Sequence, residues 1–369
     1  MIEMPSLVDQ YCHGVLRTEL GLGTFEARLA RTEGPPAPGT TLFDTQTGFA
    51  VRRWCPPLLG LEPHCPPARY LARRRELGVL EAGRRLLRGS GITAYLVDTG
   101  LPGDLTTPAE LASAGEAEAR EIVRLELLAE QVADTSGTVE AFLANLAESV
   151  HGAASNAVAF TSVAGLGHGL ALAPEPPGPV EVRGAAGRWL AGRRVGGALT
   201  DAVLLRHLLW VAVATGLPLQ LHAGLGEPGG ARTDRADPAP LTDFVRATAG
   251  LGTDLILLHG YPYHRHAAHL AGIFPHVYAD SGAALLRTGT RAATVLAEIL
   301  ELAPFGKILF SSGAQGLPEL HVVGAHLFRE ALGRVLGAWV TEGAWSPEDA
   351  RRVARLIAAD NARRVYGLD

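Results

Sequence analysis

The chain has 369 residues and a mass of 38.8 kDa, which suffices for two or three domains or for one large α/β barrel. Hydrophobic residues make up 47 % and charged residues 19 %, which excludes a mainly disordered chain. The net charge of −5 gives no excess of the basic residues that nucleic-acid-binding proteins usually carry, so we expect no nucleic-acid partner.

The sequence also lacks the usual marks of membrane and secreted proteins. No apolar run reaches the length of about 18 residues that a membrane span needs, and the first residues show no secretory signal. The three cysteines, Cys12, Cys55 and Cys65, are too few and too oddly numbered for a disulfide framework. We therefore expect no membrane partner and a cytoplasmic location.

Short apolar runs with the length and flanking residues of buried parallel strands recur along the chain. They cover residues 7–9, 94–97, 122–126, 157–160, 217–221, 255–258, 277–279 and 307–310. Between them, apolar residues recur at helical spacing over 139–150, 202–214, 292–302 and 326–340. This alternation predicts an α/β protein with a (β/α)8 TIM barrel. A doubly wound open sheet is the alternative, but no G-x-G-x-x-G follows any run, so we expect no nucleotide cofactor.

Residues 34–67 fit no barrel element. The segment is rich in proline, glycine and aromatic residues, and a loop of this length in a compact domain is usually functional or disordered. We expect one barrel domain over residues 1–369, with 34–67 as an N-terminal insertion that covers the barrel mouth. Arg52, Arg53 and Trp54 would then close over a substrate, with plain packing as the alternative.

Three histidines, His13, His222 and His259, each directly follow an apolar run. A TIM barrel gathers the carboxyl ends of its strands into the active site. One histidine there is readily explained as a satisfied core side chain, whereas three indicate a site. Neutral imidazole is a common metal ligand, and three ligands leave the open position that a catalytic zinc needs.

Five segments give the chain a family resemblance. They read LVDQYCHG at 7–14, LQLHAG at 219–224, LLHGYP at 257–262, LFSS at 309–312 and NARRVYGL at 361–368. In this order they resemble the amidohydrolase superfamily, and more narrowly the amidohydrolase-related group that includes the N-terminal domains of fungal glutamine-synthetase-like proteins. The resemblance implies a barrel of the metal-dependent-hydrolase type with one or two divalent metals. It also implies a His-x-His pair after the first strand and an aspartate after the eighth.

The sequence departs from that family pattern at three positions. Tyr11 replaces the first imidazole of the His-x-His pair, Thr161 ends the fourth strand without a lysine or an acid, and Gly313 stands where the aspartate is expected. A two-metal site is therefore not expected. His13, His222 and His259 remain, either as ligands of one weakly held Zn²⁺ or as acid/base groups in a site without metal.

Other polar residues near the strand ends are further candidates. We expect His259 and Asp280 to be catalytic, although a capping carboxylate is the alternative for Asp280. Asp98 is predicted to be a turn residue, with a substrate contact as the alternative. Cys12 is predicted to be a small buried residue, with a thiolate nucleophile paired with His13 as the alternative. Gln315, Glu319 and His321 are candidates for a displaced base. The expected substrate contacts are Tyr11, Tyr261, Tyr263, Arg265 and Gln315.

The resemblance implies a hydrolase that acts on a C–N bond, amide or γ-glutamyl, or a related bond of a small carboxylate-bearing molecule. The departures predict an atypical site, mononuclear or metal-free. Two alternatives stay open: an inactive relic, or pseudoenzyme, that serves as a binding or partner protein, and a repurposed metal-free acid/base enzyme. The expected assembly is a homo-oligomer or a pairing with a related chain.

Overall fold

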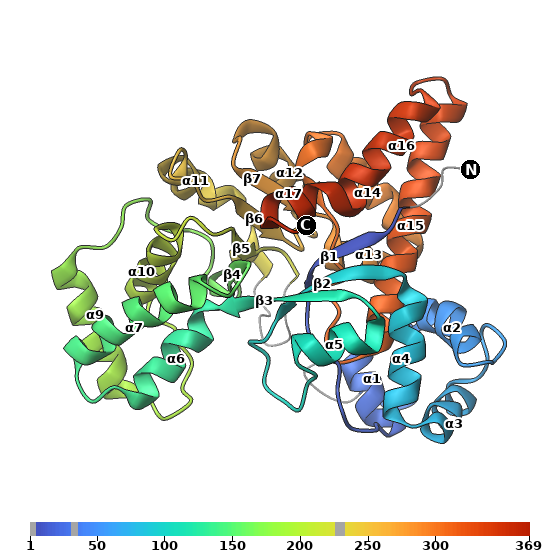
Figure 1. Ribbon diagram of the computed structural model, residues 1–369, viewed down its shortest axis with the longest axis horizontal. Coiled ribbons are helices and arrows are strands. Elements are labelled where there is room, and N and C mark those ends of the chain that lie inside the picture. Colours follow the sequence, from blue (N-terminus) through green and yellow to red (C-terminus); the bar gives the residue numbers. More distant parts are fainter. Residues whose placement is uncertain (1–4, 31–35, 226–232) are drawn as a thin grey trace. The chain divides into compact units, whose positions relative to one another are not determined.

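The computed structural model describes residues 5–30, 36–225 and 233–369 (Figure 1). It contains one eight-stranded sheet in which the strands follow each other in chain order. The strands are β1 (Leu7–Cys12), β2 (Ile92–Asp98), β3 (Glu118–Arg124), β4 (Ala159–Ser162), β5 (Leu219–His222), β6 (Leu255–Leu258), β7 (Val277–Asp280) and β8 (Ile308–Leu309). The pairs β1–β2, β3–β4, β4–β5, β5–β6 and β6–β7 are parallel.

The last strand lies beside the first, as a barrel topology requires. Gln10 N donates to Phe310 O at 3.1 Å, and Gly313 N donates to Tyr11 O at 3.1 Å. An open doubly wound sheet would separate its first and last strands, so this alternative is wrong. Sequential strand order with β8 next to β1 is the topology of a (β/α)8 TIM barrel.

The described residues group into two compact units. Unit 1 comprises residues 5–30, 36–120 and 280–369, and unit 2 comprises residues 121–225 and 233–279. Unit 1 contains the helices α1 (Leu22–Ala30), α2 (Gln46–Leu58), α3 (Pro67–Leu77), α4 (Val79–Ser90), α5 (Pro108–Gly115), α13 (Gly282–Thr288), α14 (Ala292–Leu300), α15 (Pro318–Thr341), α16 (Pro347–Arg355) and α17 (Asn361–Tyr366). Its shorter helical turns are η3 (Gly289–Arg291), η4 (Phe305–Lys307) and η5 (Leu356–Asp360).

Unit 2 follows the same alternation of strand and helix. Its helices are α6 (Leu125–Thr135), α7 (Val139–Ala154), α8 (Ala164–Gly167), α9 (Pro179–Gly192), α10 (Ala202–Val213), α11 (Thr242–Thr248) and α12 (His264–Ile273), with the turns η1 (Thr233–Ala236) and η2 (Ala239–Leu241). Every residue of β4, β5 and β6 is buried, as continuous apolar strands of a parallel sheet should be. Asp201 caps α10 by accepting bonds from the backbone of Val203 and Leu204.

The expected insertion is largely helical. Residues 34 and 35 lie outside the described residues, and the rest of 36–67 contains α2 and the start of α3. Helix α2 packs against α15 and α13, and α15 also packs against α4 and α14 (Figure 1). Tyr70 and Arg74 of α3 both donate to the buried Glu319 of α15 at 2.7 Å. These contacts anchor the segment to the helices of unit 1, and its role as a cover for the mouth stays a prediction.

Most element boundaries agree with the apolar pattern of the sequence. Some differ. The predicted strand over 122–126 is displaced, because β3 runs from Glu118 to Arg124 and α6 begins at Leu125. Strand β4 lies two residues after the predicted 157–160, and α15 begins at Pro318, eight residues before the predicted helix over 326–340. The three cysteines are free and buried. Among the described residues, no helix combines the length and the apolar character that crossing a membrane would require.

Candidate functional site

Unit 1 brings Tyr11, His13 and Asp98 together where β1 and β2 end. The Tyr11 hydroxyl lies 3.0 Å from His13 Nε2 and 2.8 Å from Asp98 Oδ2. His13 Nδ1 lies 2.8 Å from the backbone oxygen of Asp98. All three residues are at most 1 % exposed. We refer to them as the strand-end cluster.

The hydrogen bonds of this cluster hold its side chains in place. A carbonyl oxygen only accepts, so His13 Nδ1 donates to Asp98 O. The Tyr11 hydroxyl donates to the Asp98 carboxylate and also lies against His13 Nε2. His13 Nδ1 is 4.0 Å from Asp98 Oδ2, so a phenol and a carboxylate both lie beside the imidazole.

Asp98 is the residue whose role the sequence pattern missed. The turn prediction is correct, because Asp98 Oδ1 accepts from Gly100 N at 2.7 Å. The second carboxylate oxygen bonds Tyr11, however, and the backbone oxygen bonds His13. A polar residue at the end of β2, next to the strand that carries His13, was the available signal.

Asp280 lies at the end of β7 in a separate contact of unit 1. Its Oδ1 accepts from Gly282 N and its Oδ2 accepts from the Ser311 hydroxyl, both at 3.1 Å. A Cβ on residue 282 would lie 2.2 Å from Asp280 Oδ2 and 2.2 Å from Ser311 Oγ, so only glycine allows this close approach. The capping alternative therefore describes a contact that Asp280 does make, and its catalytic role stays a prediction.

Unit 2 brings His222 and His259 together. His222 ends β5 and His259 follows β6, and their ring centroids lie 5.1 Å apart at an interplanar angle of 78°. Both side chains are buried. His259 has a φ of 68°, a left-handed conformation that a residue with a side chain adopts only when its surroundings impose it. Residues in such strained conformations are enriched at functional sites, so this backbone conformation favours a functional role for the His222–His259 pair.

The expected substrate contacts are spread over both units. Tyr261 stacks on His264 at 5.5 Å and Tyr263 stacks on His266 at 5.9 Å, both at the start of α12. Arg265 is exposed on that helix, and Gln315 is half-buried after β8 in unit 1. Their roles as substrate contacts stay predictions.

The residues that could hold a metal differ between the units. In unit 1, His13 Nε2 already faces the Tyr11 hydroxyl, and Gly313 has no side chain to offer. These strand ends therefore do not fit a metal unless Tyr11 moves. In unit 2, the adjacent imidazoles of His222 and His259 fit two positions of a zinc-type site, which takes three or four protein ligands.

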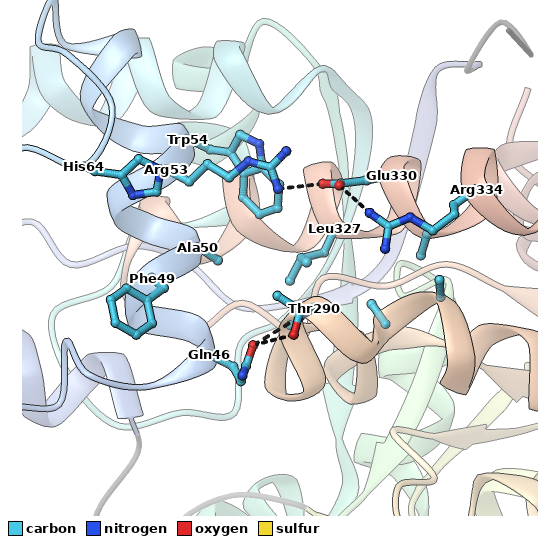
Figure 2. A pocket seen from close by; sticks show the side chains of 14 residues that line it. Gln46, Phe49, Ala50, Arg53, Trp54, His64, Thr290, Leu327, Glu330 and Arg334 are labelled. Atoms are coloured by element: carbon cyan, nitrogen blue, oxygen red, sulfur yellow. Dashed lines mark hydrogen bonds and ion pairs between the residues drawn. The ribbon is translucent and has the colours of Figure 1, made fainter.

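A separate pocket of about 330 Å³ lies among the helices of unit 1 (Figure 2). It is lined by residues of α2, α14, α15 and η3 and by His64 between α2 and α3, and Arg53 and Trp54 are among them. Glu330 accepts from Arg53 and from Arg334, each at 2.9 Å, and Thr290 N donates to Gln46 at 3.1 Å (Figure 2). Because helices rather than strand ends form this pocket, it is not the candidate active site.

Comparisons with known proteins agree with this architecture. The model of the family described as Amidohydrolase matches residues 118–368. Protein fluG of Emericella nidulans is 34 % identical over 154 residues, which make up 41 % of this chain and 18 % of that protein. The matched region is thus less than a fifth of that relative's length.

Solved structures share the fold. A protein of Lactobacillus casei ATCC 334 that is assigned as a metal-dependent hydrolase superposes with a TM-score of 0.84 at 23 % identity, covering 99 % of this chain and 96 % of that one. The uronate isomerase of Thermotoga maritima superposes with a TM-score of 0.63 at 13 % identity, covering 98 % and 94 %. At these identities the likeness shows the fold alone.

Proposed function

Because the chain belongs to the amidohydrolase family, we propose that it is a hydrolase that cleaves an amide or γ-glutamyl C–N bond in a small carboxylate-bearing molecule. The observation that carries the proposal is the strand-end cluster of Tyr11, His13 and Asp98. It lies where a barrel of this type performs its chemistry.

The cluster has the composition of an acid/base group. Burial of three polar side chains is costly unless each is hydrogen-bonded, and here the phenol joins the imidazole to the carboxylate. The carbonyl of Asp98 fixes the ring orientation of His13 through Nδ1. The side chain that would exchange protons with a substrate is therefore held in one orientation, as efficient catalysis requires.

Amide hydrolysis needs one proton to arrive and one to leave. The attacking water must lose a proton, and His13 takes it at a neutral Nε2 as the C–O bond forms. The leaving nitrogen must gain a proton, and the resulting imidazolium supplies it as the C–N bond breaks, so His13 returns to its starting state. Both transfers require the Tyr11 hydroxyl to leave His13 Nε2. Asp98 stabilises the imidazolium through its backbone oxygen and its nearby carboxylate. General acid/base catalysis of this kind contributes about 10²–10⁴-fold in rate.

Because the chain belongs to this family, we expect it to bind a metal cofactor. A divalent metal, when bound, supplies a Lewis acid that polarises a carbonyl. His222 and His259 are the residues of unit 2 that would hold it. The proposal that the ion is a weakly held Zn²⁺ rests on these imidazoles. His13 as a further ligand stays a prediction, because it requires the Tyr11 hydroxyl to leave Nε2.

The test is turnover of N-acyl and γ-glutamyl amino acids by the wild type and by His13→Asn. His269→Asn is the matched control, since His269 is an exposed histidine of α12. Both are assayed after chelation and after addition of zinc, with elemental analysis of each sample. We expect turnover that the control keeps and His13→Asn loses. A folded wild type that hydrolyses none of these substrates in either condition would favour the relic that only binds a partner.

A further inference from the structure

A second polar cluster of unit 1 has no part in the proposed chemistry. It consists of Asp9 and Cys12 of β1 and His321 in the first turn of α15. All three are fully buried, with 0 % of each residue exposed. One potential ligand atom from each lies within 4.8 Å of those of the other two. Carboxylate, thiolate and imidazole are the three side-chain groups that zinc prefers.

Among the described residues, Asp9 and His321 lack the charged hydrogen-bond partners that usually stabilise buried ionisable side chains. Asp9 accepts from Ser312 N at 2.8 Å and from the Ser312 hydroxyl at 2.5 Å, and neither donor carries a charge. Within the part of the chain that the structure describes, neither ring nitrogen of His321 has a hydrogen-bond partner. The imidazole packs edge-to-face on Tyr95 at 5.5 Å, so its orientation is fixed. Buried nitrogens of this kind call for an explanation.

We propose that Asp9, Cys12 and His321 form a binding site for a zinc-type divalent cation, which ties β1 to α15. This site is distinct from the imidazole pair of unit 2 and from the strand-end cluster. Tetrahedral zinc holds its ligand atoms roughly 3.3–3.7 Å apart, given bond lengths of about 2.0–2.3 Å. His321 Nδ1 already lies 3.6 Å from Asp9 Oδ2. The cation would draw Cys12 Sγ to the same spacing.

The charges of the site also fit a divalent cation. A cation that binds a cysteine displaces the thiol proton to solvent. One thiolate, one carboxylate and a divalent cation then sum to zero charge among three fully buried residues. The Ser312 hydroxyl or a water would take the fourth position.

The competing explanation needs no metal. His321 could take up a proton and form a simple ion pair with Asp9 across the 3.6 Å separation. In that arrangement Cys12 is only a hydrogen-bond donor, to Leu96 O at 3.6 Å and to the Asp9 carboxylate. The two explanations differ in whether a sulfur–metal bond forms, and spectroscopy reports that bond directly.

The experiment is cobalt substitution of the full chain. Chelator-treated protein is titrated with Co²⁺, and the near-ultraviolet thiolate-to-cobalt charge-transfer band is recorded for the wild type, Cys12→Ser and His321→Gln. Cys65→Ser is the control, because Cys65 is a buried cysteine elsewhere in unit 1. We expect the wild type and the control to show the band at the final intensity of one cobalt–thiolate bond per chain, and Cys12→Ser to show no band. His321→Gln should weaken cobalt binding at least tenfold.

The wild-type spectrum alone tests the proposal, so the experiment remains decisive even if a variant fails to fold. A folded wild type that binds cobalt without a sulfur band, or binds none, would overturn the site and leave the simple ion pair. Cobalt on the imidazoles of unit 2 gives no sulfur band, so the two sites are read separately. The hydrolase proposal is tested by turnover and is unaffected by either result.

Discussion

The strand ends of the two units carry the same kind of residue in different surroundings. In unit 1, His13 has one ring nitrogen on a backbone carbonyl and the other on the Tyr11 hydroxyl. In unit 2, His222 and His259 present their rings to each other at 5.1 Å. Both arrangements follow from a histidine placed directly after an apolar strand. The neighbouring side chains differ, with a phenol and a carboxylate beside His13 and a second imidazole beside His222. For this reason we propose proton exchange in unit 1 and a shared cation in unit 2.

The strand ends of unit 1 form a structured site through hydrogen bonds from several elements. The Tyr11 hydroxyl joins His13 to Asp98. The Gly313 N–H donates to Tyr11 O between β8 and β1. That Tyr11 and Gly313 stand in for metal ligands of the family stays a prediction.

The largest expected effect is on unit 1. His13→Asn should lower kcat/KM by about 10²–10⁴-fold, because the variant loses the group that exchanges protons with the substrate. Steady-state kinetics on the best substrate of the panel measure it, with His269→Asn as the control. Equal losses in both variants would mean that unit 1 is not the acid/base region.

Removing an imidazole from the pair in unit 2 should lower the affinity of the protein for Zn²⁺. His222→Asn removes one of two adjacent ligands, so we expect Zn²⁺ affinity to fall at least tenfold while the fold is kept. Competition with a chromogenic chelator gives the affinity. Cys12→Ser, which leaves this pair intact, should keep the zinc that the pair holds. An unchanged affinity in His222→Asn would show that the pair is not a ligand set.

A smaller effect is expected for Tyr11→Phe. The variant keeps the ring but leaves the buried Asp98 Oδ2 without the phenol hydroxyl, which should lower the free energy of unfolding by about 1–3 kcal/mol. Urea denaturation measures this change. The same variant frees His13 Nε2 of the phenol, so zinc binding should strengthen rather than weaken. Weaker zinc binding would mean that Tyr11 assists the metal instead of excluding it from His13.

The smallest effect concerns a buried carboxyl group of unit 2. Burial raises the pKa of Glu126, although Ser162 donates to its Oε1 at 2.5 Å. The folded state then binds the proton more tightly than the unfolded chain. This contribution to stability is fully present below the unfolded pKa and is lost as pH rises to the folded pKa.

Glu126→Gln should remove this pH dependence of the free energy of unfolding. The variant should therefore gain stability relative to the wild type as pH rises. Unfolding in urea at several values from about pH 4 to about pH 7 measures it. Glu140→Gln, on the exposed face of α7, is the control and should follow the wild type. Parallel curves for wild type and Glu126→Gln would contradict the raised pKa.

The sequence by itself determined the order of strands and helices. Eight apolar runs of strand length sufficed for the barrel topology, because buried parallel strands carry continuous apolar residues that local patterns reveal. The same runs placed His13, His222 and His259 at strand ends. The motifs at those ends identified the family, which the match over residues 118–368 confirms.

Only the tertiary structure decided which polar groups meet. Asp98 is 85 residues from His13, and Ser312 is 303 residues from Asp9, yet each pair is hydrogen-bonded. These contacts depend on the register of neighbouring strands, and in β1 that register shifts between Asp9 and Cys12. Such a shift leaves no trace in hydrophobic periodicity, since it arises from the pairing of backbone groups between strands. For that reason the sequence located the strand ends, whereas their proton and metal chemistry required the fold.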